Sequence, residues 1–208
     1  MKAQRMYMVI ALLLMAVVSA TAAPTTTGQL TPVAAPGSLA VGSFENSELF
    51  YLIQELSSQS VVTPFSGGLI GGMVPAGVPL DFYIIHSDPV QTQASSYIGS
   101  VTFDTPILGL YVGSSSLDAL DPGMITLGSP ISTYPTGVTD RGLETSQADS
   151  YILSNGNKTL TLRVSTGPSV DQVRVVVASA VPEPASVVLF GVGLIAVFGL
   201  KKLRGLSR

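Results

Sequence analysis

TLTLRV at residues 159–164 carries the clearest structural pattern of this chain, and QVRVVV at residues 172–177 repeats it. Leucine or valine stands at every second position of the first stretch, and valine does so in the second. Alternate side chains of an extended chain face the same side, so this period predicts two half-buried β-strands.

Three earlier stretches are rich in aromatic and β-branched residues and are bounded by Pro, Gly, Asp or Ser: LDFYIIH at 80–86, YIGSVTF at 97–103 and ILGLYV at 107–112. We expect strands there as well. Asn155-Gly156 is typical of a hairpin turn, and Asp121-Pro122-Gly123 also predicts a turn. Many short strands with frequent turns predict an all-β fold, with residues 41–179 forming a single antiparallel β-sandwich of jelly-roll or Ig-like type.

Three segments need separate predictions. Residues 47–56 (SELFYLIQEL) fit a first strand or a short helix capped by Ser47, because their leucines and isoleucine also share one helical face; we favour the strand. The glycine-rich residues 67–72 (GGLIGG) predict a loop or a tightly packed strand edge. Residues 23–40 are rich in Thr, Pro, Ala and Gly without a period, so we expect a flexible leader.

The N-terminal residues have the layout of a secretory signal peptide. Lys2 and Arg5 precede an apolar stretch at residues 6–18, and small residues follow it. We therefore expect residues 1–22 to form a signal helix that signal peptidase of the general secretion machinery removes. Cleavage is expected after Ala22, with Ala20 as the alternative, because small residues precede both positions.

The C-terminal residues 181–208 begin with two prolines around one acidic residue. Pro182 and Pro184 fix φ and lack an N–H, so the segment around Glu183 should be extended and open to recognition by another protein. Residues 185–200 carry no charge and would reach about 24 Å as a helix, which a bilayer with a ~30 Å core accepts after mild thinning. We expect this stretch to be a C-terminal transmembrane helix.

Basic residues directly follow the apolar stretch and make up the charged part of the tail at 201–208: Lys201, Lys202, Arg204 and Arg208. Lys and Arg beside a membrane segment mark its cytoplasmic end. The tail is therefore expected to lie in the cytoplasm, with the helix anchored in the inner membrane.

The segment Val181-Pro182-Glu183-Pro184, the apolar stretch and the basic tail together resemble the PEP-CTERM protein-sorting domain of exported proteins in Gram-negative bacteria that make extracellular polysaccharide. The resemblance implies that a membrane transpeptidase, an exosortase, recognises Val181 to Pro184 and removes the tail. It also implies a route through the inner membrane to the cell surface or the extracellular space. The strand pattern of the body is similar to uncharacterised all-β ectodomains of such proteins.

The body of the chain is acidic once both targeting segments are set aside. Between Ala23 and Ala180, four basic residues stand against twelve acidic ones, a net charge of −8, whereas the whole chain carries −3. Such a domain repels phosphate backbones, which argues against nucleic acid as a partner. The chain has no cysteine, so thiol catalysis and thiolate metal sites are excluded.

His86 is the only histidine, and Ser87 and Asp88 follow it. Neighbours in one strand point to opposite faces, so these three residues cannot converge as a catalytic triad, and the chain has no Gly-x-Ser-x-Gly sequence. We expect a histidine at a strand end that makes local hydrogen bonds.

Carboxylates gather in predicted loops, at positions 118, 121, 140, 144 and 149. Calcium prefers such oxygen ligands, and Asp118 and Asp121 are the candidates for a calcium site, although no EF-hand spacing is present. The alternative is a solvated acidic edge. Two exposed pairs are also expected from sequence proximity, Arg141 with Glu144 and Asp171 with Arg174.

We expect a surface or matrix protein without catalysis or cofactor. One alternative is a carbohydrate-binding module for exopolysaccharide, which should line up exposed aromatic residues, since tyrosines are numerous. The other is a secreted hydrolase, which should hold close carboxylates, or His86 beside a hydroxyl, in a cleft.

Overall fold

The computed structural model describes residues 23–90, 95–144, 148–166 and 169–180. These residues are mostly β-strand, which confirms the all-β prediction, and they contain one helix: β1 (Thr25–Gly28), β2 (Leu30–Val33), β3 (Phe50–Ser60), β4 (Phe65–Ser66), β5 (Met73–Val74), β6 (Pro79–Ser87), β7 (Ser95–Thr102), β8 (Ile107–Tyr111), α2 (Ser114–Thr126), β9 (Ser150–Ser154), β10 (Thr159–Thr166) and β11 (Asp171–Ala178).

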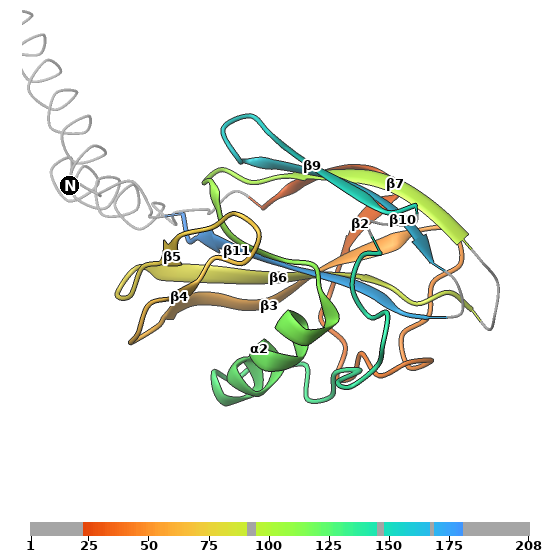
Figure 1. Cartoon of the computed structure of the whole chain (residues 1–208), viewed down its shortest axis with the longest axis horizontal. Helices are drawn as coiled ribbons and strands as arrows, with labels where there is room; N and C mark the ends of the chain where they lie inside the picture. The colour runs from red at the N-terminus through yellow and green to blue at the C-terminus, as the bar shows by residue number, and fades with distance from the viewer. Residues whose placement is uncertain (1–22, 91–94, 145–147, 167–168, 181–208) are drawn as a thin grey trace, which may run out of the picture. The chain divides into compact units, whose positions relative to one another are not determined.

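Two large sheets lie face to face (Figure 1). The four-stranded sheet has the order β1-β7-β10-β9 and the five-stranded sheet the order β2-β3-β6-β11-β8. Their facing sides share one hydrophobic core, to which β10 contributes Leu160 and Leu162 and β11 contributes Val173 and Val175. The alternation in TLTLRV and QVRVVV therefore does select the residues that fill the space between the sheets.

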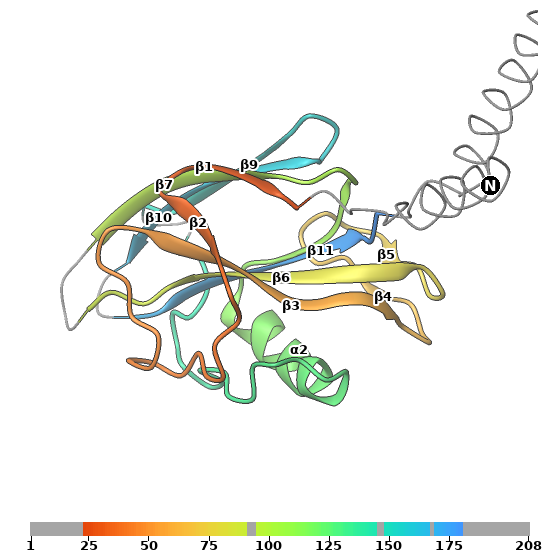
Figure 2. The ribbon, with the colours of Figure 1, turned by 180° about the vertical axis from the view of Figure 1, so that it is seen from behind.

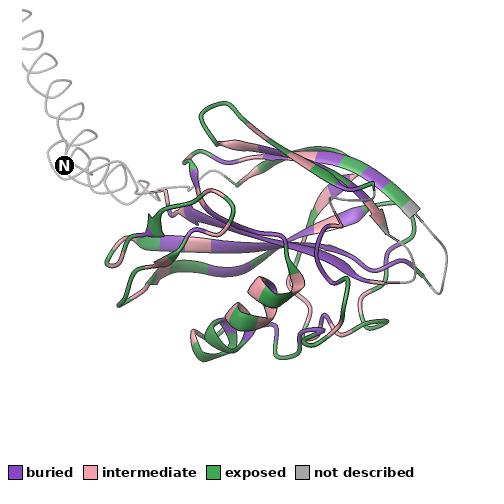
Figure 3. Cartoon of the chain, in the orientation of Figure 1, coloured by how far each residue is buried: buried purple, intermediate pink, exposed green. Residues whose placement is uncertain are grey.

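The outer side of the five-stranded sheet is covered by α2 and its flanking loops (Figures 1 and 2). Leu117 and Met124 of the helix pack in a second hydrophobic cluster with Val176 of β11 and Ile84 of β6. Strand β11 is consequently buried on both faces rather than half-buried, as Figure 3 shows along its length. In β10, by contrast, Arg163 stays exposed.

The prediction of a flexible leader at residues 23–40 is wrong. Thr25–Gly28 pairs with β7, and Leu30–Val33 pairs with β3 in a parallel arrangement. Gly28, at φ 71°, carries the chain from one sheet to the other, and Leu30 is only 3% exposed. Composition misled here because the stabilisation comes from hydrogen bonds with distant strands and from the burial of one leucine, neither of which is local.

The turn predicted at Asp121-Pro122-Gly123 is also wrong, because all three residues lie inside α2. Proline removes one helical hydrogen bond and glycine weakens a helix, so local propensity opposes this structure. Burial of Leu117, Asp121 and Met124 on one side of the helix outweighs that preference. Tertiary packing therefore overrides the turn signal.

Other local predictions are confirmed. Residues 80–86, 97–103 and 107–112 fall on β6, β7 and β8, and residues 47–56 contain the start of β3 rather than a helix. The Asn155-Gly156 turn joins β9 to β10, with positive φ at 53° and 62°. Residues 67–72 form the loop between β4 and β5, as expected.

Among the described residues, no helix has both the length and the apolar character needed to cross a bilayer. The predicted signal helix at 1–22 and the predicted transmembrane helix at 185–200 lie outside the described residues.

Candidate functional site

Two arginines lie fully buried between β11 and the helix layer, each 0% exposed. Arg174 donates from Nε and Nη2 to the two carboxylate oxygens of Glu55, at 2.7 and 2.8 Å. Its Nη2 also donates to Oδ1 of Asp121 at 3.0 Å. Arg141 donates to Asp118 and to Asp121, both at 2.6 Å. We call these five residues the arginine network.

A β-bulge in β3 explains how Glu55 reaches Arg174. Gln54 is opposite Tyr83 and Leu56 is opposite Phe82, which leaves Glu55 as the extra residue of the strand. A bulge changes the direction in which the side chains of a strand point. As a result, Glu55 and Leu56, although they are neighbours in the strand, are both buried on the helix side of the sheet. The sequence analysis missed Glu55, because a bulge leaves no mark in the apolar alternation.

The calcium site expected at Asp118 and Asp121 is not supported, since guanidinium groups bind both carboxylates. Burial raises the pKa of Asp121, but the hydrogen bond and charge of Arg141 lower it more, so the group stays ionised. The predicted pairs of Arg141 with Glu144 and of Arg174 with Asp171 are wrong. In β11, residues 171 and 174 point to opposite faces, which no local pairing overcomes.

Tyr134 closes the arginine network from the loop after α2. Its hydroxyl donates to Oε1 of Glu55 at 2.7 Å, and its ring lies 5.2 Å from the Arg174 guanidinium carbon. Glu55 therefore accepts three hydrogen bonds while its side chain is fully buried. A carboxylate can accept about four hydrogen bonds, so most of the capacity of Glu55 is used within the protein.

His86 is 0% exposed and both of its ring nitrogens have partners. Nε2 lies 3.1 Å from the Phe44 carbonyl oxygen and must carry the proton, because a carbonyl only accepts. Nδ1 then accepts from Nε2 of Gln172 at 2.8 Å, while Oε1 of Gln172 accepts from Nε of Arg141 at 2.8 Å. Burial lowers the pKa of His86 to about 4, so the ring is neutral near pH 7.

His86 is hydrogen-bonded, as expected, but its partners Phe44 and Gln172 are 42 and 86 residues away in the sequence rather than local. Ser87 faces the core between the sheets, on the opposite side of β6. The carboxylate of Asp88 accepts from the backbone N–H of Gly42 at 2.7 Å instead of contacting the ring. The three neighbours therefore do not converge.

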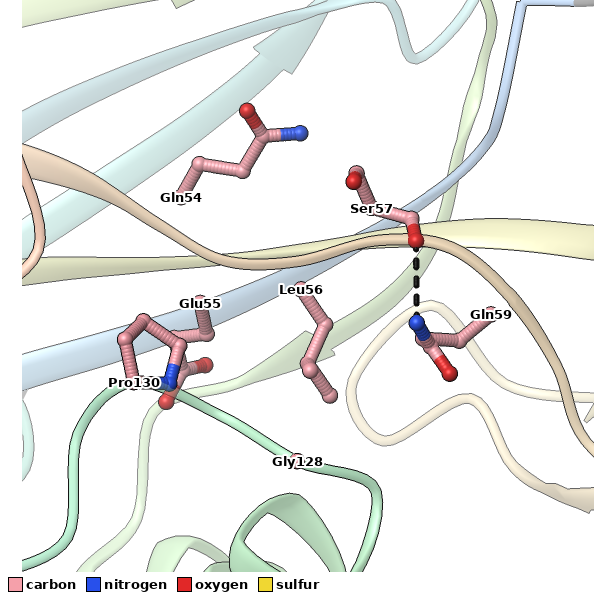
Figure 4. Close-up of a pocket in the computed structure, with 7 residues that line it drawn as sticks. All are labelled: Gln54, Glu55, Leu56, Ser57, Gln59, Gly128 and Pro130. Carbon is pink, nitrogen blue, oxygen red and sulfur yellow. Dashed lines mark hydrogen bonds between the residues drawn. The ribbon is translucent and has the colours of Figure 1, made fainter.

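A cavity of about 320 Å³ lies beside the bulge of β3 (Figure 4). It is lined by strand residues and by the loop that follows α2: Gln54, Glu55, Leu56, Ser57, Gln59, Gly128 and Pro130. Glu55 is its one carboxylate, and Arg174 and Tyr134 already bind that group. The cavity therefore lacks the paired carboxylates that hydrolysis of a glycosidic bond requires.

The tyrosines singled out in the sequence lie mainly in the core. Tyr83, Tyr97, Tyr111 and Tyr134 are buried, and Tyr151 is partly buried against the core between the sheets. None of the large hydrophobic residues exposed in the described part of the chain is aromatic. This part of the chain has no exposed row of aromatic rings on which a sugar chain would stack.

A second group of carboxylates lies at one end of the core between the sheets. Glu144, Asp149 and Asp171 each place an oxygen within 4.8 Å of the others, a spacing that suits metal ligands. Burial and the neighbouring carboxylates raise the pKa of Asp171 to about 9 and that of Glu144 to about 7. From the sequence, Glu144 and Asp149 were expected among the loop carboxylates, whereas Asp171 was expected to pair with Arg174; the signal for its actual place is an acidic residue at an inward position of the β11 alternation.

Comparison with known proteins identifies one segment of the chain. No curated protein and no solved structure matches the chain. Residues 180–204 match the family model of the PEP-CTERM protein-sorting motif, which directly follows the end of β11 at Ala178. The match supports a secreted protein that is sorted by exosortase-type machinery, with membrane anchoring before processing. The chain therefore carries a PEP-CTERM protein-sorting motif at residues 180–204.

Proposed function

We propose that the protein is an exported surface or matrix protein whose tail an exosortase-like transpeptidase removes, and that its β domain catalyses no reaction. The match at residues 180–204 carries this proposal. Val181, Pro182, Glu183 and Pro184 would be the residues that the transpeptidase recognises. The β domain, a sandwich of jelly-roll or Ig-like type, would then reach the cell surface or the extracellular space.

The proposed topology follows from charge. Residues 1–22 direct export and are removed by signal peptidase, residues 185–200 span the inner membrane, and the basic tail at 201–208 stays in the cytoplasm. Processing at the Pro-Glu-Pro segment would free the domain on the outer side.

The absence of catalysis is proposed from the state of the polar side chains. Both nitrogens of His86 are hydrogen-bonded in the core, and Glu55 is held by Arg174 and Tyr134. A general base needs a free lone pair near a cleft. Neither nitrogen of His86 is free, and the carboxylate of Glu55 already accepts three hydrogen bonds, two of them from a guanidinium group. Exopolysaccharide binding lacks a supporting observation, because the tyrosines lie mainly in the core.

The test is the intact mass and cell fraction of the native protein, compared with a variant in which Pro182, Glu183 and Pro184 are all alanine. We expect the wild type to lose its tail and to appear outside the inner membrane, and the variant to keep its tail there. A matched control replaces Pro130 and Pro135, which lie in the β domain, by alanine. A full-length tail in the inner membrane for both wild type and variant would reduce residues 181–208 to a plain anchor.

A further inference from the structure

The acidic group at the end of the core contains an unsatisfied buried oxygen. Asp171, the first residue of β11, is 3% exposed, and its Oδ2 has no hydrogen-bond partner. Directly across the ladder from it stands Ser87 of β6, which is 1% exposed and whose Oγ also lacks a partner. Opposite residues of an antiparallel pair project to the same face, so both side chains with an unpaired oxygen lie on the core side of β6 and β11. Buried polar groups left this way are costly, and a polar occupant would satisfy them.

Asp149 and Glu144 approach this position from the segment before β9. The two oxygens of Asp149 accept hydrogen bonds from the backbone N–H groups of Ser165 and Glu144, at 2.7 and 2.8 Å. These bonds fix the Asp149 carboxylate and fasten Glu144 next to it, while each oxygen keeps a second lone pair. The chain thus fixes the Asp149 carboxylate, together with the backbone that carries Glu144, close to Asp171.

Within the described part of the chain, no basic side chain forms an ion pair with this group. None of the ion pairs between described residues involves Glu144, Asp149 or Asp171, because Arg141 and Arg174 point to the other side of the five-stranded sheet. In the arginine network, two guanidinium groups form ion pairs with the carboxylates. Among the described residues, no guanidinium group does so with Glu144, Asp149 or Asp171. Like charges this close repel strongly in a buried setting.

We propose that Glu144, Asp149 and Asp171 bind a divalent cation, and that this cation is Ca²⁺. Oxygen ligands about 2.4 Å from one ion lie at most about 4.8 Å apart, and the three carboxylates meet that limit. The proposal does not depend on how the tail is processed.

Calcium fits this group better than magnesium does. Mg²⁺ demands near-ideal octahedral geometry and keeps several of its waters, whereas Ca²⁺ accepts six to eight oxygens in irregular arrangements. Asp149 and Asp171 are 5% and 3% exposed, so a bound ion would exchange most of its water for protein oxygens on that side. Glu144, which is half-buried, leaves the remaining positions open to water.

The test uses the purified full-length chain in detergent, freed of metal with EDTA, and titrates it with CaCl₂ or MgCl₂ in a calorimeter while Tm is followed in parallel. We expect one Ca²⁺ per chain, a higher Tm with Ca²⁺, and weaker binding of Mg²⁺. Asp171→Asn should weaken Ca²⁺ binding at least tenfold, yet its metal-free Tm should stay close to that of the wild type, because asparagine keeps the shape of the carboxyl group, which is uncharged near pH 7 at a pKa of about 9. The control Asp104→Asn changes an exposed aspartate elsewhere and should bind Ca²⁺ as the wild type does.

Several results would overturn the proposal. One is a wild type that shows neither heat nor a shift in Tm at millimolar Ca²⁺, and another is an Asp171→Asn variant that binds Ca²⁺ as tightly as the wild type. Tighter binding of Mg²⁺ would overturn the choice of ion. If Asp171→Asn does not fold, Glu144→Gln decides the question, because Glu144 lies at the open side of the group and its loss should weaken Ca²⁺ binding without unfolding the chain.

Discussion

Replacing Glu55 by glutamine should destabilise the protein far more than so small a change would on its surface. Glu55 accepts two hydrogen bonds from Arg174, at 2.7 and 2.8 Å, and one from the Tyr134 hydroxyl at 2.7 Å, with both charged groups fully buried. Glutamine has nearly the shape of glutamate, but one of its two acceptor oxygens becomes an N–H₂ group, which would face the N–H and O–H donors of Arg174 and Tyr134. It also removes the charge that balances the guanidinium.

The size of the effect follows from what Arg174 retains. Breaking a buried ion pair by removing one partner costs about 3–5 kcal/mol. Arg174 still donates to Asp121 at 3.0 Å and to the Leu117 carbonyl at 3.3 Å, so we expect the lower end, about 3 kcal/mol. For a domain of roughly 150 residues this lowers Tm by about 6–12 °C.

The assay is urea unfolding followed by circular dichroism, with Glu48→Gln, an exposed glutamate on the same chain, as the matched control. The control should change the free energy of unfolding by less than about 0.5 kcal/mol. The double variant Glu55→Leu with Arg174→Met should recover much of the loss, because it removes both buried charges. The reasoning fails if Glu55→Gln costs under about 1 kcal/mol, or if the double variant loses the sum of the two single losses.

Three further outcomes are expected from unfolding experiments. The pKa of His86 is lowered from 6.5 to about 4 in the folded state, so the contribution of the neutral ring to stability is complete above pH 6.5 and is lost as the pH falls towards 4. Between pH 7 and pH 4, the free energy of unfolding of the wild type should therefore fall by about 3 kcal/mol more than that of His86→Gln. Equal pH profiles of the two proteins would contradict this. Gly142→Ala should destabilise the protein by about 1–3 kcal/mol or more, because a Cβ there would overlap the backbone oxygen of Val112. Gly123→Ala in α2 should stabilise the protein by about 0.5–1 kcal/mol, because a Cβ there has open space around it. Leu30→Ala should lower the free energy of unfolding by about 2–4 kcal/mol if β2 is part of the core. Leu69→Ala, whose side chain is 52% exposed, should lower it by less than about 0.5 kcal/mol. Equal effects would mean that residues 23–40 are a flexible leader after all.

The predictions that succeeded rest on short-range pattern. Alternation placed β10 and β11, and Asn155-Gly156 placed the hairpin between β9 and β10, because side-chain period and turn geometry are properties of a few adjacent residues. The predictions that failed, the leader at 23–40 and the turn at 121–123, concern segments whose structure depends on distant partners.

The polar groups show the same division. The sequence identified His86 and the acidic positions 144 and 149 as chemically notable, but Glu55 reaches Arg174 through a bulge, and Asp171 meets Glu144 only when β11 enters the sheet. Local spacing suggested that Arg141 and Arg174 pair with their neighbours. Their actual partners are up to 119 residues away.

The amino-acid sequence is sufficient to recognise the longer strands of the body and the sorting motif at 180–204, because each depends on consecutive residues: a period of two, a turn dipeptide, or a proline pair before an apolar run and basic residues. The sheet order, the structure of residues 25–33, the helix at 114–126 and the partners of the buried charges follow from the folded chain. Those features depend on burial and hydrogen bonds between segments far apart in sequence, and their free energy exists only once the two sheets and the helix have come together.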